Sequence, residues 1–153
     1  MKLGFGLYRH MLNEDYYKFA VQCGATHAVV HLCDYGLDSS GQQGDDQPVG
    51  DDRGWGYATH PEVWPLDELL AIKAELEAHG LVFHAIENFD PAQWCDVLID
   101  GPKRAEQIEA IKQQIRNVGA AGIAVFGYNF SIAGVAARVK LETRGGARAV
   151  GLD

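Results

Sequence analysis

Polar and ionisable side chains stand at the ends of four short apolar runs of this chain. The interiors of these runs are apolar apart from His84. One polar residue at the end of a run means little, because any strand becomes polar as it leaves the core. Four such ends together favour a site that transfers protons and binds a polar small molecule. The groups are Tyr8-Arg9-His10, His31 with Cys33 and Asp34, Glu87-Asn88, and Tyr128-Asn129.

The apolar runs are predicted strands, over residues 3–8, 28–32, 81–86 and 123–128. Runs without strict alternation are typical of a parallel sheet that helices cover. Hydrophobic residues at helical spacing predict helices between the strands, over residues 14–22, 65–80 and 102–118. Capping residues support these bounds: Asn13 before the first helix, Pro65 at the first position of the second, and Gly119 and Gly122 after the third. The third helix should bury Ile108, Ile111, Ile115 and Val118.

This order predicts an α/β fold of parallel (β/α) units, with about four strands and three helices. It corresponds to the first half of a TIM barrel, whose eight units typically need about 250 residues. We therefore expect residues 1–153 to form a single N-terminal partial (β/α)8-barrel domain, with residues 131–153 irregular. Barrel enzymes place catalytic side chains at the carboxyl ends of the strands, where the four polar groups lie.

Residues 35–63 form a long segment rich in Gly, Asp, Ser and Gln after the second predicted strand. We interpret it as an inserted long βα loop, the kind of connection that builds the active face of a barrel. Its acidic residues do not follow the spacing of a calcium-binding loop, so a solvated loop is favoured over a metal site. These residues are Asp45, Asp46, Asp51 and Asp52.

Composition limits the classes of partner. The net charge of −8 argues against a nucleic-acid or anionic-membrane surface, because Lys and Arg hold both. The apolar runs are shorter than the roughly 20 residues that a membrane helix needs, and no signal peptide is visible. The cysteines Cys23, Cys33 and Cys95 are odd in number and lack C-x-x-C spacing. We therefore expect a cytoplasmic protein with reduced thiols that acts on a small molecule.

Four segments of this chain, taken together in this order, carry a family resemblance: Val63-Trp64-Pro65-Leu66-Asp67-Glu68, Ala85-Ile86-Glu87-Asn88, Ile115-Arg116-Asn117-Val118 and Gly127-Tyr128-Asn129-Phe130. They resemble the corresponding stretches of the mannonate dehydratases, which are xylose-isomerase-like barrels. The resemblance covers most of this chain and the N-terminal half of a family member. It implies a lyase, a hydro-lyase that dehydrates D-mannonate to 2-keto-3-deoxy-D-gluconate in hexuronate (glucuronate) catabolism. It also implies a divalent ion, Mn²⁺ or Fe²⁺, whose ligands lie beyond residue 153.

The implied reaction suggests roles for the polar strand ends. Removing the proton beside a carboxylate requires a base, an acid at the departing hydroxyl and donors at the carboxylate. His31 and Tyr128 are the candidate catalytic, proton-handling groups. Arg9 suits the substrate carboxylate, since its guanidinium can donate two parallel hydrogen bonds. Glu87 and Asn129 complete the candidate substrate-binding set by holding sugar hydroxyls.

Other interpretations stand beside these. His31 could be a hydrogen-bonded core histidine, Arg9 an ordinary ion-pair residue, and Tyr128 a packing residue at the barrel rim. Cys33, Asp34 and His31 make a poor metal site, because neighbouring strand residues alternate between faces. The chain could instead be a sugar isomerase or epimerase of the same superfamily, or an inactive truncated half barrel. An open parallel sheet and a homo-oligomer that pairs two such sheets are the alternatives for its assembly.

Overall fold

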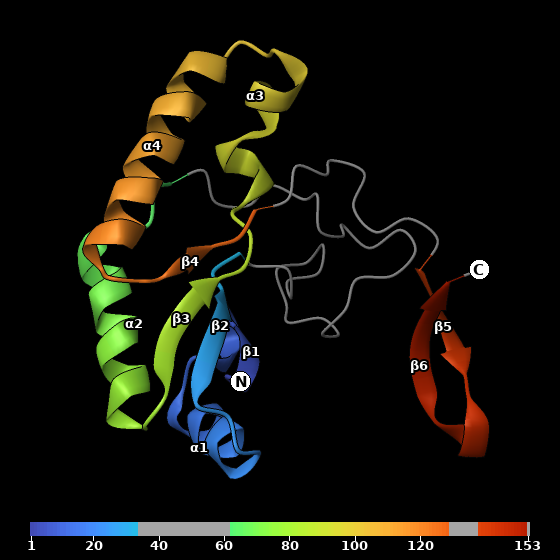
Figure 1. Ribbon diagram of the computed structural model, residues 1–153. Helices are drawn as coiled ribbons and strands as arrows, with labels where there is room; N and C mark the ends of the chain where they lie inside the picture. The colour runs from blue at the N-terminus through green and yellow to red at the C-terminus, as the bar shows by residue number, and fades with distance from the viewer. Residues whose placement is uncertain (34–61, 129–137, 153) are drawn as a thin grey trace.

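The computed structural model describes residues 1–33, 62–128 and 138–152. Its main unit is a four-stranded parallel sheet of order β1-β2-β3-β4, formed by β1 (Gly4–Tyr8), β2 (His27–His31), β3 (Val82–Ile86) and β4 (Val125–Phe126). Each strand pairs with the next one along the chain, as successive units of a TIM barrel do. The predicted α/β fold with parallel (β/α) units is confirmed (Figure 1). The predicted loop over 35–63 lies outside the described residues except at its last two positions.

Helices connect the strands and cover one face of the sheet. They are α1 (Glu14–Gln22), α2 (Leu66–Ala78), α3 (Cys95–Ile99) and α4 (Arg104–Ala120), with short 3-10 turns at Arg9–Met11 and Pro91–Gln93. The Asn13 side chain accepts a hydrogen bond from the Tyr16 N–H, which confirms its predicted cap. Pro65 is the N-cap of α2 and not its first helical residue. The sequence prediction missed the short helix α3.

One hydrophobic core lies between the sheet and these helices. It combines Leu7 and Val30 from the strands with Tyr17 of α1, Leu69 of α2 and Val118 of α4. Because residues alternate along a strand, the neighbours of these strand residues face the other side of the sheet. That second side carries Gly4, Gly6, Tyr8, His27, Val29 and His31.

Helix α4 buries only part of the side predicted. Val118 is buried and Ile111 packs against the core, as predicted. Ile115 is instead 54% exposed, and Gln107 and Gln114 are buried. The side-chain oxygen of each glutamine accepts a hydrogen bond, which offsets part of the cost of burying it. The Gln107 Oε1 accepts from the Asp96 N–H at 2.8 Å, and the Gln114 Oε1 accepts from the Trp64 N–H at 2.9 Å. Hydrophobic periodicity could not reveal this, because the two inward positions are polar.

The end of the third unit also differs from the prediction. Gly119 lies inside α4, whereas Gly122 follows the helix with φ of +72°, the left-handed conformation that ends many helices. Strand β4 spans two residues, shorter than the predicted 123–128. Among the residues that the structure describes, no helix has the length and apolar character needed to cross a membrane.

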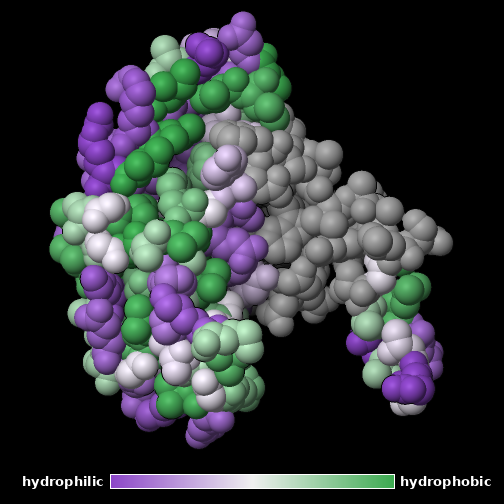
Figure 2. Space-filling model, in the orientation of Figure 1, coloured by the Kyte–Doolittle hydropathy of each residue, from purple (hydrophilic) through white to green (hydrophobic). Residues whose placement is uncertain are grey.

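The prediction that residues 131–153 are irregular is wrong for residues 138–152. Strands β5 (Arg138–Glu142) and β6 (Arg148–Leu152) pair antiparallel as a separate hairpin, joined by a 3-10 turn at Arg144–Gly146. Gly145 and Gly146 adopt φ of +77° and +75°. The glycines that suggested an irregular loop therefore form the turn of a hairpin. Figure 1 shows the hairpin as a unit of its own, and its turn end is mostly hydrophilic in Figure 2.

Candidate active site

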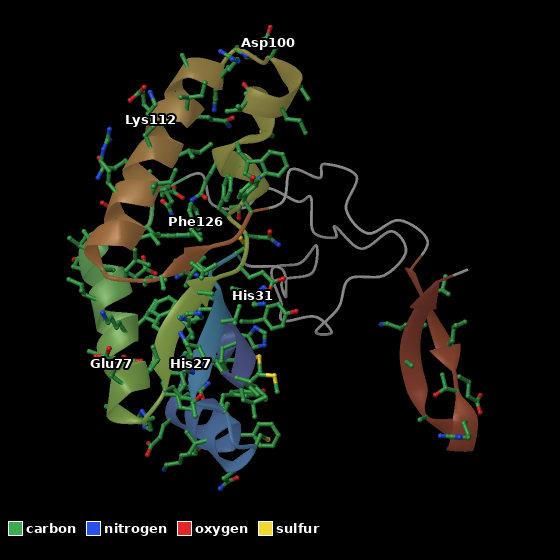
Figure 3. All side chains as sticks on the ribbon, viewed as in Figure 1. His27, His31, Glu77, Asp100, Lys112 and Phe126 are labelled. Atoms are coloured by element: carbon green, nitrogen blue, oxygen red, sulfur yellow. The ribbon has the colours of Figure 1, made fainter. Side chains whose placement is uncertain are left out.

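The candidate site is built around His31, the last residue of β2. Its side chain is buried, and its Nε2 lies 3.2 Å from the Glu87 Oε2. Glu87 directly follows β3, and its backbone N–H donates to the Val30 carbonyl at 2.9 Å. Pairing of β2 with β3 therefore brings together two of the predicted site residues at the carboxyl edge of the sheet. Figure 3 shows His31 at this end of β2 and His27 at the opposite end.

Two opposing effects act on the His31 imidazole. Burial lowers the pKa of His31 below its ordinary value, while the Glu87 carboxylate raises it by a smaller amount. Desolvation dominates because the imidazole is 7% exposed, whereas half of the Glu87 side chain meets solvent. His31 is consequently neutral at neutral pH, the state in which an imidazole can accept a proton.

Arg9 lies beside this pair but is held by protein groups. Its Nε donates to the Leu32 carbonyl at 3.0 Å, and its Nη1 lies 2.9 Å from the Glu68 Oε1. The Glu68 carboxylate belongs to α2, so the contact ties the end of β1 to the start of the second helix. This geometry fits the ion-pair interpretation, and substrate binding by Arg9 stays a prediction.

The fourth strand contributes less than the sequence suggested. Tyr128 follows β4 by two residues and is 68% exposed, which leaves its proposed catalytic role a prediction. Asn129 lies outside the described residues. Strands β3 and β4 are nevertheless joined at their ends, where the Gly127 N–H donates to the Ile86 carbonyl at 2.8 Å and the Asn88 N–H donates to the Gly127 carbonyl at 3.1 Å.

The structure adds two residues that sequence reasoning left without a role. Tyr8 pairs in register with His31, and its ring centroid lies 4.5 Å from that of the imidazole. Its place at the end of β1 was visible in the sequence, but its partner depends on strand register. Asp90 is a buried carboxylate just beyond Glu87, and its Oδ1 accepts from the Ala92 N–H at 2.9 Å. Asp90 thus shapes the turn after β3, as an aspartate two residues before its donor commonly does.

The described residues do not fit a resident metal ion. Within residues 1–33, 62–128 and 138–152, no group of three or more His, Cys, Asp or Glu side chains could hold one. Cys33 is buried two residues after His31, and Asp34 lies outside the described residues. No chemical step is therefore assigned to a metal at this edge of the sheet.

Comparison with known proteins gives one consistent family. The sequence model of D-mannonate dehydratase (UxuA) matches residues 24–152. A mannonate dehydratase of Streptococcus pneumoniae (strain 70585) is 44% identical over 69 residues, which are 45% of this chain and 18% of that protein. One from Thermotoga petrophila is 39% identical over 69 residues, with 45% and 19% covered.

A solved structure has the same fold over most of the described chain. The crystal structure of mannonate dehydratase from Streptococcus suis serotype 2 matches with a TM-score of 0.58 and 29% identity. The match covers 85% of this chain and 30% of the solved chain. The chain therefore spans less than a third of the length of that relative.

Proposed function

The chain belongs to the D-mannonate dehydratase family, and from this membership we propose that the carboxyl edge of β1, β2 and β3 serves the dehydration of D-mannonate. The product would be 2-keto-3-deoxy-D-gluconate, a step of hexuronate (glucuronate) catabolism. The observation that carries the proposal is the buried His31 imidazole 3.2 Å from the Glu87 carboxylate at this edge.

The reaction divides into proton transfers that side chains of this edge could perform. A base removes the proton at C2 beside the carboxylate, and the electron pair forms a C2–C3 double bond as the C3 hydroxyl leaves. An acid protonates that hydroxyl, so water departs, and the resulting enol becomes the 2-keto product. His31 suits the base because its pKa is lowered and its imidazole is neutral. Tyr128 is the proposed acid.

Binding of the sugar acid would use the remaining predicted residues. Glu87 is half exposed beside His31, so it can accept a hydrogen bond from a substrate hydroxyl while it also orients the imidazole. Arg9 would bind the substrate carboxylate only by exchanging its Glu68 partner or by using other donors of its guanidinium. Asn129 is the proposed second hydroxyl ligand.

The proposal also covers the cofactor, the cellular location and the domain organisation. A divalent ion, Mn²⁺ or Fe²⁺, is proposed as the cofactor on the strength of the family alone. A cytoplasmic location is proposed because the three cysteines are odd in number and lack C-x-x-C spacing, which does not suggest a disulfide framework. A single domain over residues 1–153 stays a proposal: the one core unites the four-stranded sheet with its helices, whereas β5 and β6 form a sheet of their own.

The test is turnover of D-mannonate by the chain with Mn²⁺ or Fe²⁺, followed by mass spectrometry of the product. We expect loss of one water from the substrate in the wild type, and a fall of about 100-fold or more in His31→Asn and Glu87→Gln. The matched controls are His27→Asn on the same strand and Glu77→Gln on α2, which should retain turnover. A product of unchanged mass would favour an isomerase or epimerase, and the absence of any product would contradict the proposal for this chain.

A further inference from the structure

The imidazole of His31 is in contact with an aromatic ring from the neighbouring strand. Tyr8 and His31 are in-register partners of β1 and β2, and their ring centroids lie 4.5 Å apart with planes tilted by 30°. This separation is that of a packed aromatic pair. A second imidazole, that of His10, stacks on Tyr8 with centroids 5.9 Å apart and planes 6° apart.

The residue of β1 before Tyr8 on the same face is Gly6. An added Cβ at Gly6 would lie 3.9 Å from the His31 Nε2, so this part of β1 also lies close to the imidazole. Gly6 contributes no side chain to this face, whereas Tyr8 packs its ring against the His31 ring.

We propose that Tyr8 is a positioning residue for His31, and that its ring holds the imidazole plane so that Nε2 stays directed at Glu87. A histidine ring can rotate about its Cβ–Cγ bond, and an aromatic ring packed against it restricts that rotation. Tyr8 itself touches no reacting atom in this scheme. The catalytic consequence rests on the proposed function, whereas the positioning of the imidazole does not.

The experiment is NMR of the whole chain with labelled histidine and tyrosine. In the wild type we expect the His31 ring protons to be shifted upfield by the Tyr8 ring, and the Tyr8 ring carbons to titrate with the His31 midpoint. A His10→Gln background removes the second imidazole that stacks on Tyr8. Tyr8 carbons that do not follow His31 in that background would overturn the proposal without any change at Tyr8.

Substitutions at Tyr8 provide the second arm. Tyr8→Phe keeps the ring and should preserve the His31 shifts, whereas Tyr8→Leu should remove the upfield shift and move the His31 midpoint upwards as solvent reaches the imidazole. Tyr16→Leu, at an exposed tyrosine of α1, is the matched control and should change neither. Unchanged His31 signals in a folded Tyr8→Leu protein would contradict the proposal; if that variant unfolds, the wild-type titration decides.

Turnover separates this inference from the proposed function. With an active wild type, Tyr8→Leu should lower kcat about tenfold with a smaller change in KM, and Tyr8→Phe should restore kcat. If the wild type shows no turnover, the proposed function fails while the NMR result still decides whether Tyr8 positions His31. Normal kcat in Tyr8→Leu together with displaced His31 signals would overturn the catalytic consequence alone.

Discussion

Two effects of opposite sign, burial of the imidazole and the nearby Glu87 carboxylate, decide the charge of His31. The larger effect is burial, which disfavours the imidazolium, and the smaller one is Glu87, which favours it. The Nε2–Oε2 distance of 3.2 Å is that of a salt bridge, but the lowered pKa leaves the His31 ring neutral at neutral pH. The same contact can therefore orient a base without protonating it.

Replacing Glu87 tests the direction in which its carboxylate shifts the pKa of His31. Glu87→Gln removes the carboxylate that raises the pKa of His31 but leaves the imidazole buried, so the pKa should fall further below 6.5. NMR titration of the His31 ring protons measures the midpoint. His27 lies at the other end of β2 and serves as the internal control, since its midpoint should not move. A rise in the His31 midpoint would contradict the assignment of Glu87 as the favourable partner.

The lowered pKa of His31 also makes stability depend on pH. The unfolded chain binds a proton to this group near pH 6.5, whereas the folded chain binds it only at lower pH. The contribution is thus present above pH 6.5 and is lost as the pH falls towards the folded pKa. His31→Asn should flatten the fall in urea midpoint below pH 6.5, leaving the part due to His27, whose pKa is also lowered. An unchanged slope would show that His31 does not contribute.

At the scale of elements, the four segments that resemble mannonate dehydratases contact one another in two pairs. Asn117 of α4 donates from Nδ2 to the Trp64 carbonyl at 2.8 Å, while the Trp64 N–H donates to the Gln114 Oε1. Helix α4 therefore binds both the backbone N–H and the backbone carbonyl of Trp64, which lies just before α2. The other two segments meet where Gly127 bonds to Ile86 and Asn88. These contacts link the loop, helix and strand ends on which the site residues stand.

The Gln114 contact predicts a measurable loss of stability. Gln114→Leu leaves the Trp64 N–H without its acceptor in a buried place, which costs about 1–3 kcal/mol of unfolding free energy. Urea denaturation followed by Trp fluorescence and circular dichroism measures the loss. Arg116→Leu, at an exposed position of the same helix, is the control and should stay within about 0.5 kcal/mol. Equal effects of the two substitutions would mean that the contact is unimportant.

Two glycines at the end of α4 predict opposite outcomes for the same substitution. Gly119→Ala adds a methyl group with nothing within 4 Å inside a helix, so stability should rise by about 0.5–1 kcal/mol. Gly122→Ala must adopt φ of +72° with its Cβ 3.2 Å from the Lys73 Nζ, and stability should fall by about 1 kcal/mol or more. Chemical denaturation measures the free energy of unfolding of both variants against the wild type. A change in stability of the same sign in both variants would contradict the position at which α4 ends.

At the scale of the whole molecule, the described part of the sheet ends on both sides in a strand that pairs with one neighbour. β1 and β4 are its outer strands, and the helices cover the side that carries the core. Figure 2 also shows hydrophobic surface over α3, where Leu98 and Ile99 are 49% and 62% exposed. Open strand edges and exposed apolar surface favour association between chains.

We therefore expect larger species in sedimentation velocity as the protein concentration rises. Val125→Lys places a charge on the edge strand β4 and should weaken the association. Leu70→Lys is the matched control on α2, because both side chains are 45% exposed. A monomer at every concentration, or equal effects of the two lysines, would contradict an interface along the sheet edge.

Local pattern in the sequence was enough to predict the parallel (β/α) order, the cap at Asn13 and the polar ends of the strands. These properties depend on residues close together in the chain, where side-chain periodicity and capping act. Pairing of His31 with Glu87, of Tyr8 with His31 and of Arg9 with Glu68 depended on strand register and helix placement. The burial of two glutamines of α4 likewise depended on hydrogen-bond partners in other segments. Tertiary structure decided them, because a buried polar group is stable only where the fold supplies its partner.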